Sequence, residues 1–122
     1  MLSRLIIRNY AIIPELDIAI QPGLTIITGE TGAGKSILLG ALGLALGRRA
    51  ETKVLPDDDS KCIVEAHFQL EEESLKSLFA AEGLDYDSLL ICRREISSGG
   101  RSRSFINDTP VSLKLLQEIT GH

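Results

Sequence analysis

The sequence predicts an α/β fold in which a mixed or antiparallel sheet surrounds one apolar helix. Three observations support this prediction. Two strand-like segments open the chain, a glycine-rich loop then leads into a helix rich in Leu and Ala, and alternating segments resume after it. The chain has 122 residues, of which 43% are hydrophobic and 25% charged, which is the size and composition of one small globular domain.

The first segments are predicted to be strands. Residues 2–10 place Leu5 and Ile7 on one face and two arginines on the other. Residues 12–20 alternate in the same way, which is typical of an antiparallel sheet with one solvated face. Residues 24–28 form a short, mostly apolar run, which predicts a strand buried on both faces.

A helix is predicted over residues 35–46, and a loop over residues 47–60. Glycine weakens a helix by roughly 1 kcal/mol relative to alanine, so glycines here predict the close approach of another backbone. There are three of them: Gly40, Gly43 and Gly47. Arg48 and Arg49 follow the helix, where cations complement its dipole. A role facing nucleotide or DNA is the alternative for these two arginines.

The middle of the chain is predicted to form a strand and then a helix. Residues 61–70 alternate between apolar and polar positions, with Cys62 and Val64 on the apolar face. Residues 71–82 begin with three glutamates, which complement a helix dipole, and continue with an apolar stripe.

The last third is predicted to form a hairpin and a helix. Residues 89–96 and 103–106 form the two strands, joined by a turn at residues 97–100. Ser112 is placed to cap a final helix. The chain then stops without a closing strand.

Charge and cysteine content exclude several classes of protein. Lys and Arg number 13 and Asp and Glu 17, so the net charge of −4 argues against a freestanding basic nucleic-acid module. Two cysteines thirty residues apart fit reduced, buried thiols rather than a disulfide framework. The near-apolar run at residues 37–46 is about half of the ~20 residues that span a bilayer, and Arg4 and Arg8 interrupt any signal peptide. A soluble intracellular protein is expected.

One motif carries chemistry. The pattern G-x-x-x-x-G-K-[ST] is matched in full by Gly29, Glu30, Thr31, Gly32, Ala33, Gly34, Lys35 and Ser36. Its glycines let successive N–H groups curl around a phosphate, and the helix N-terminus that follows favours an anion. Lys35, the expected catalytic residue, would reach the β- and γ-phosphates of the nucleotide, and the Ser36 hydroxyl would bind Mg²⁺. ATP and Mg²⁺ are therefore the expected cofactors.

The flanks of this motif resemble a known family. Two strand-like segments before the loop resemble the head domains of ABC-type ATPases. Several stretches are similar to the RecN family of bacterial DNA repair proteins, which is related to the SMC proteins. They are LSRLIIRNY at 2–10, GETGAGKS at 29–36, LALGRRA at 44–50, GRSRSFIND at 100–108 and PV at 110–111. The resemblance covers essentially the whole chain and implies a P-loop NTPase fold of the ABC/SMC head type.

The resemblance also implies a function and a set of partners. Members act in recombinational repair of DNA double-strand breaks, with a head split by a long coiled coil. ATP joins two such heads between the P-loop of one and the signature motif of the other. Residues 1–122 would be the N-terminal half of a head, in a cytoplasmic, nucleoid-associated protein. Asn9 is a further candidate to approach the nucleotide.

Two parts of a hydrolytic head are not expected within the chain. A Walker B segment needs Asp and Glu after four apolar residues, but the apolar run ending at Cys92 is followed by Arg93 and Arg94. The three aspartates at 57–59 follow too short a run and are expected to lie in a solvated loop. Residues 97–101 imitate the L-S-G-G signature but lead into a strand-like stretch, which predicts a hairpin turn instead. The fragment alone is therefore not expected to hydrolyse ATP.

Two other function classes remain open. A self-contained small P-loop kinase or GTPase would need its own Mg²⁺-supporting Asp on a second buried strand, and no segment supplies one. A non-enzymatic interaction or DNA-tethering module with a vestigial P-loop is the third possibility. Arg101 and Arg103 on the predicted hairpin could contact DNA phosphates or ATP in a dimer, and the alternative is that they are solvated. The histidines and cysteines lack the spacing of a zinc site.

Overall fold

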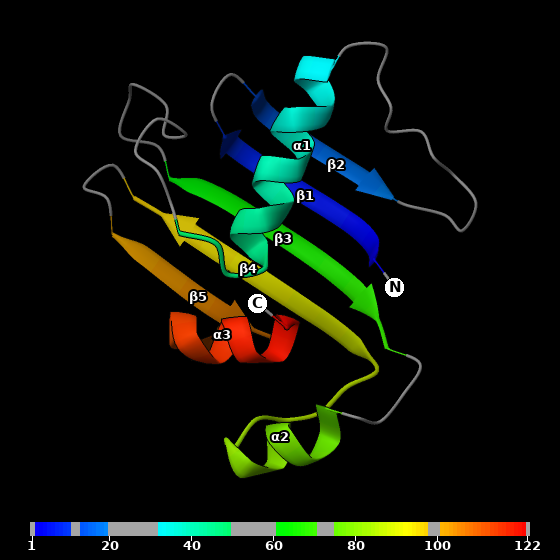
Figure 1. Cartoon of the computed structure of the whole chain (residues 1–122), viewed down its shortest axis with the longest axis vertical. Coiled ribbons are helices and arrows are strands. Elements are labelled where there is room, and N and C mark those ends of the chain that lie inside the picture. Colours follow the sequence, from blue (N-terminus) through cyan, green and yellow to red (C-terminus); the bar gives the residue numbers. More distant parts are fainter. Residues whose placement is uncertain are drawn as a thin grey trace.

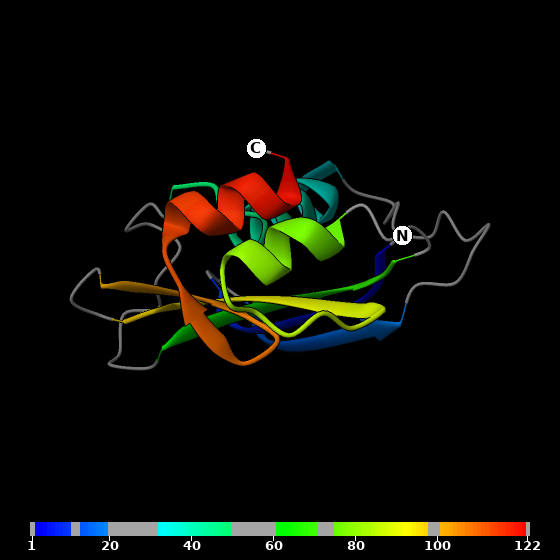
Figure 2. The same ribbon diagram turned by 90° about the horizontal axis from the view of Figure 1, so that it is seen from below.

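The computed structural model describes residues 2–10, 13–19, 32–49, 61–70, 75–97 and 101–121. Within them lies one antiparallel sheet with the strand order β2-β1-β3-β4-β5-β6. Its strands are β1 (Leu2–Tyr10), β2 (Ile13–Ala19), β3 (Cys62–Gln69), β4 (Leu89–Ile96), β5 (Ser102–Ile106) and β6 (Thr109–Val111). The described helices are α1 (Gly32–Ala45), α2 (Lys76–Ala81) and α3 (Leu113–Thr120). All three lie on the same face of the sheet (Figures 1 and 2).

Alternation in the strands decides which face the helices cover. In β3, Cys62, Val64 and Ala66 are fully buried beneath the helices, whereas the residues between them are only partly covered. The same period of two runs through β1 and β4. The predicted half-exposed antiparallel strands are therefore confirmed for β1, β2 and β3.

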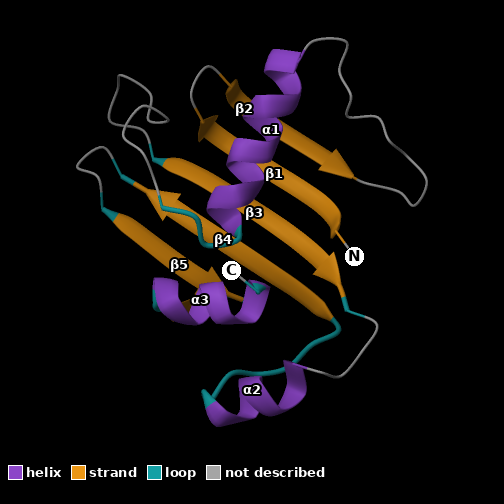
Figure 3. Ribbon diagram, in the orientation of Figure 1, coloured by secondary structure: helices purple, strands orange, loops and turns teal. Residues whose placement is uncertain are grey.

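The helix α1 packs over β1 and β3 (Figure 3). Its small residues Ala41 and Ala45 are completely buried, which lets the helix axis lie close to Ile7 and Val64 of the sheet. The helix begins three residues earlier than predicted and ends one residue earlier. Gly32 and Gly34 of the motif are therefore accommodated in its first turn, despite the low helix propensity of glycine.

A second apolar cluster joins α2 and α3 to β4 and β5. It contains Phe79, Leu90, Cys92, Ile106, Leu116 and Ile119. The Ser112 hydroxyl accepts a hydrogen bond from the Leu115 N–H at 3.0 Å, so the predicted cap of the last helix is confirmed. Gly121, with φ of +84°, ends the helix in the left-handed conformation.

The structure differs from the sequence prediction at β6. The prediction missed this strand because the turn before it contains no glycine. Asn107 and Asp108 both take positive φ, +47° and +68°, which is the conformation of a type I′ turn. Pro110 is tolerated because β6 lies at the edge of the described sheet.

The helix α2 covers Lys76–Ala81 of the predicted residues 71–82, and residues 71–74 lie outside the described residues. The strand predicted at residues 24–28 also lies outside them, as do residues 50–60 of the predicted loop.

The prediction that another backbone approaches α1 at its three glycines is partly wrong. Side chains, rather than a second backbone, approach α1 at Gly40 and Gly43. A Cβ at Gly40 would lie 2.6 Å from the Tyr10 hydroxyl oxygen, and one at Gly43 would lie 3.2 Å from the Arg48 guanidinium. A Cβ at Gly47 would lie 2.7 Å from Cγ of Gln117, with the Gln117 Cα at 3.4 Å.

Candidate nucleotide site

The structure places the second half of the glycine-rich motif at the start of α1. The backbone of Gly32, Ala33, Gly34, Lys35 and Ser36 is helical, and these residues form the first turns of α1. Gly29, Glu30 and Thr31 lie outside the described residues, as do the side chains of residues 32–36. The first backbone N–H groups of a helix have no intrahelical acceptor, so the end of α1 that carries the motif fits an anionic phosphate.

The strand β1 brings two polar side chains towards neighbouring elements. Tyr10 lies against Gly40 of α1, and only a glycine leaves room for its hydroxyl. Asn9 adopts a positive φ of +53°, and its Nδ2 donates a hydrogen bond to the Lys61 carbonyl at 3.1 Å. The Asn9 amide therefore ties the end of β1 to the start of β3.

The C-terminal end of α1 is held by side chains distant in sequence. Nη1 of Arg94 donates to the Leu44 carbonyl at 3.0 Å and to the Arg48 carbonyl at 2.8 Å. From α3, Gln117 Nε2 donates to the Gly47 carbonyl at 2.9 Å, and the Thr120 hydroxyl donates to the Leu46 carbonyl at 2.5 Å. We call Arg94, Gln117 and Thr120 the α1 clamp.

Sequence reasoning missed Arg94, which it treated only as the wrong residue for a Walker B segment. The missed signal is its position in β4, two residues after Cys92 and two before Ile96, on the buried face. The Arg94 residue is 1% exposed. This burial lowers the pKa of the guanidinium below its usual range.

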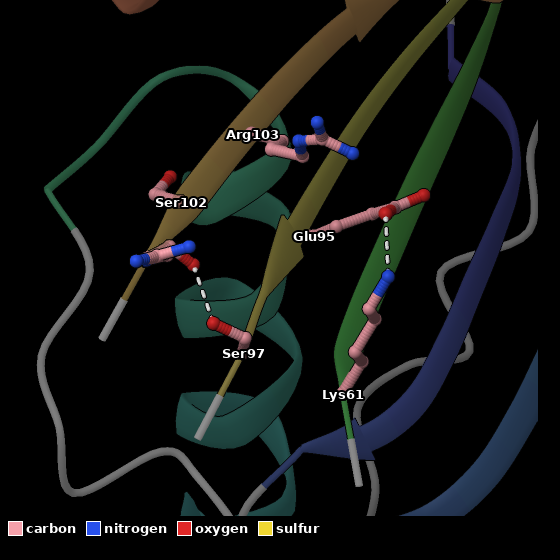
Figure 4. A pocket seen from close by; sticks show the side chains of 6 residues that line it. Lys61, Glu95, Ser97, Ser102 and Arg103 are labelled. Carbon is pink, nitrogen blue, oxygen red and sulfur yellow. Dashed lines mark hydrogen bonds and ion pairs between the residues drawn. The ribbon is translucent and has the colours of Figure 1, made fainter. Parts of the chain in front are cut away.

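A groove lies where β3 begins, β4 ends and β5 begins (Figure 4). It has a volume of about 600 Å³ and is lined by Lys61, Glu95, Ser97, Arg101, Ser102 and Arg103. Nζ of Lys61 lies 3.6 Å from a Glu95 carboxylate oxygen. The Arg101 and Arg103 side chains are exposed and form no ion pair with any described residue. We call this feature the hairpin groove.

The remaining sequence candidates have the following positions. β4 and β5 pair antiparallel, and Ile96 is opposite Ser102, so the flanks of residues 97–101 form the predicted hairpin. The central residues 98–100, like the aspartates at 57–59, lie outside the described residues. Arg48 and Arg49 are exposed just beyond α1.

The described residues contain neither a metal cluster nor a membrane-crossing helix. No group of three or more His, Cys, Asp or Glu side chains there is placed to hold a metal ion. Across the same ranges, no helix has the length and apolar character needed to cross a membrane.

The family of the chain follows from sequence comparison. Residues 4–113 match the AAA domain family, and the chain belongs to it. Its sequence is 44% identical to DNA repair protein RecN of Haemophilus influenzae over 100% of the chain and 23% of that protein. It is also 44% identical to RecN of Vibrio cholerae, over 98% of the chain and 22% of that protein. The chain thus spans less than a quarter of the length of these relatives.

The fold is shared with SMC heads. The Smc head domain of Pyrococcus furiosus, which has an extended coiled coil and is bound to the C-terminal domain of ScpA, superposes with a TM-score of 0.79 at 17% identity. The match covers 98% of this chain and 32% of that one. The predicted resemblance to the N-terminal region of RecN and the predicted SMC head-type fold are both confirmed.

Proposed function

We propose that the chain is the ATP-binding lobe of a RecN-like ATPase that acts in recombinational repair of DNA double-strand breaks. The observation that carries the proposal is the complete motif at residues 29–36, located at the start of α1 in an SMC head-type fold. The similarity to RecN over the whole chain supports the repair role. The chain would form the N-terminal half of a head in a cytoplasmic, nucleoid-associated protein.

In this proposal each part of the motif has one task. Backbone N–H groups of residues 29–34 surround the phosphates, and the positive end of the α1 dipole stabilises their charge. Lys35 neutralises charge on the β- and γ-phosphates, and the Ser36 hydroxyl is the protein ligand of Mg²⁺. The bound Mg²⁺ would stabilise negative charge on the phosphate oxygens.

Hydrolysis is proposed to need parts that residues 1–122 do not supply. An Asp to support Mg²⁺ and a Glu to activate water would come from a downstream Walker B segment. The signature motif of a second head would complete the site across an ATP-dependent dimer. The SMC head-type fold supports this arrangement.

Equilibrium binding of Mg-ATP to the 122-residue chain tests the proposal. We expect weak binding, loss of binding in Lys35→Ala, and unchanged binding in the matched control Lys114→Ala, an exposed lysine of α3. Equal binding by wild type and Lys35→Ala would contradict the proposal. Robust ATP hydrolysis by the isolated chain would contradict the need for downstream catalytic parts.

DNA is proposed as the partner of the full-length protein. The hairpin groove supports this proposal, because Arg101 and Arg103 form no ion pair with described residues and can neutralise phosphates. Duplex DNA binding should weaken in the double variant Arg101→Gln/Arg103→Gln, with a salt slope reduced by about 2. An unchanged salt slope of DNA binding would exclude the hairpin groove as a DNA contact. If the DNA affinity is the same with and without ATP, and the same in Lys35→Ala, a non-enzymatic DNA tether would be favoured.

A further inference from the structure

The last carbonyl groups of a helix have no intrahelical donors, and their partners fix the position of that end. The α1 clamp engages the Leu44 carbonyl in the last turn of α1, and the carbonyls of Leu46, Gly47 and Arg48 in the segment that directly follows the helix. These donors come from β4 and α3, which are 46 to 74 residues away in sequence. The end of α1 that lies opposite the motif is thus fixed by side chains of β4 and α3, two elements of the second apolar cluster.

Arg94 is the charged member of the clamp. Its Nε and Nη2 donate to the Ser102 hydroxyl at 3.1 and 2.7 Å, while Nη1 donates to the Leu44 carbonyl in the last turn of α1 and to the Arg48 carbonyl just beyond it. A cation is stabilised by the negative end of a helix dipole, which helps to offset the cost of burial. A methionine of similar length would fill the same space without that cost. The geometry of these four hydrogen bonds therefore gives Arg94 a role beyond packing.

We propose that Arg94 is a positioning residue for the nucleotide site. It fixes the C-terminal end of α1 against β4 and β5, and so holds the motif at the other end of the same helix. A helix of 14 residues is about 21 Å long and moves nearly as a rigid body, so a tilt at one end displaces the other. The inference rests on the proposed binding of nucleotide at residues 29–36.

Ser102 extends this connection to the hairpin groove. Its hydroxyl accepts from Nε and Nη2 of Arg94. Ser102 also lines the hairpin groove (Figure 4). The orientation of the Arg94 guanidinium is therefore set by the β4–β5 hairpin. Removing the Ser102 hydroxyl should loosen α1 without changing any residue of the helix.

The test compares Mg-ATP dissociation constants of the 122-residue chain and its variants. Arg94→Met should raise the dissociation constant about tenfold, because two charge-assisted bonds are lost, one to Leu44 of α1 and one to Arg48 just beyond it. Arg94→Lys should recover about a third of that loss on a logarithmic scale, since it keeps the charge but not the fork of donors. The matched control is Arg93→Met, from the opposite face of the same strand, which should bind within about twofold of wild type.

A second measurement separates positioning from general loss of stability. Amide hydrogen exchange at residues 37–46 without nucleotide should be faster in Arg94→Met but unchanged in Arg93→Met. Phe79→Leu, a substitution in the second apolar cluster, should lower the melting temperature without changing nucleotide affinity below that temperature. If Arg94→Met does not fold, Ser102→Ala serves in its place. It should raise the Mg-ATP dissociation constant about threefold and speed amide exchange at residues 37–46 about threefold.

The outcomes are distinguishable. Wild-type affinity and wild-type exchange in a folded Arg94→Met or Ser102→Ala would overturn the positioning role and leave the proposed function standing. Equal loss of affinity in Phe79→Leu would also overturn it, because the effect would then be general. Failure of the wild type to bind Mg-ATP would overturn the proposed function and this inference with it.

Discussion

Replacement of Gly47 by alanine should destabilise the protein by about 3 kcal/mol. Gly47 follows α1 and has φ of +112°, beyond the left-handed well that L-residues occasionally occupy. A Cβ there would lie 2.7 Å from Cγ of Gln117 in α3. Alanine therefore introduces both backbone strain and an overlap with a side chain of the α1 clamp.

Each contribution has a separate magnitude. Left-handed backbone costs an alanine about 1–2 kcal/mol, and the stiffer unfolded chain returns about 0.4–1 kcal/mol of that. Moving Gln117 away breaks the 2.9 Å hydrogen bond from its Nε2 to the Gly47 carbonyl, which costs about 0.5–1.5 kcal/mol. Overpacking against the nearby Gln117 backbone adds about 1 kcal/mol.

Gly83→Ala is the matched control, because Gly83 also has positive φ, +70°, but a Cβ there would meet nothing within 4 Å. Thermal and urea unfolding followed by circular dichroism should show a loss of about 12 °C for Gly47→Ala and about 4 °C for Gly83→Ala. Equal losses in the two variants would refute the reasoning, because backbone strain alone would then explain Gly47.

Two further predictions concern ionisable groups. Burial raises the pKa of the Cys62 thiol to about 11 and that of Cys92 to about 12. Native protein should therefore resist alkylation at pH 8, and its stability should fall as pH rises above about 9, where only unfolded thiols lose their protons. Fast labelling of native protein would disagree with this. The hydrogen bond from Arg4 lowers the pKa of the Asp17 carboxyl below its usual 3.8. A carboxyl titration followed by NMR should show this pKa rising in Arg4→Met, and an unchanged titration would argue against the pair.

Local signals determined most of the elements. The alternation of residues 2–10 and 61–70 predicted two strands whose faces the structure confirms, and residues 89–96 were predicted as a strand without an assigned face. Ser112 predicted the start of α3 because a hydroxyl cap acts within three residues of the chain. Such signals succeed because both partners of each interaction lie close together in sequence.

The nucleotide site was predicted from the sequence in a different way. The motif at residues 29–36 specifies phosphate chemistry by residue type and spacing alone, without any long-range contact. Its flanks added the resemblance to RecN, which the comparisons confirm. The role of Lys35 is a prediction that Mg-ATP binding to Lys35→Ala tests, and the role of Ser36 also stays a prediction.

The tertiary structure alone decided how the motif-bearing helix is held. No local signal placed β1 between β2 and β3, or joined Arg94 to carbonyls 46 and 50 residues away. The role of an arginine at a buried strand position can be inferred only when its hydrogen-bond acceptors are known. Here the main-chain acceptors are the carbonyls of Leu44 in α1 and Arg48 just beyond it. Packing of distant segments supplies those acceptors, so no periodicity or motif within the chain could have revealed them.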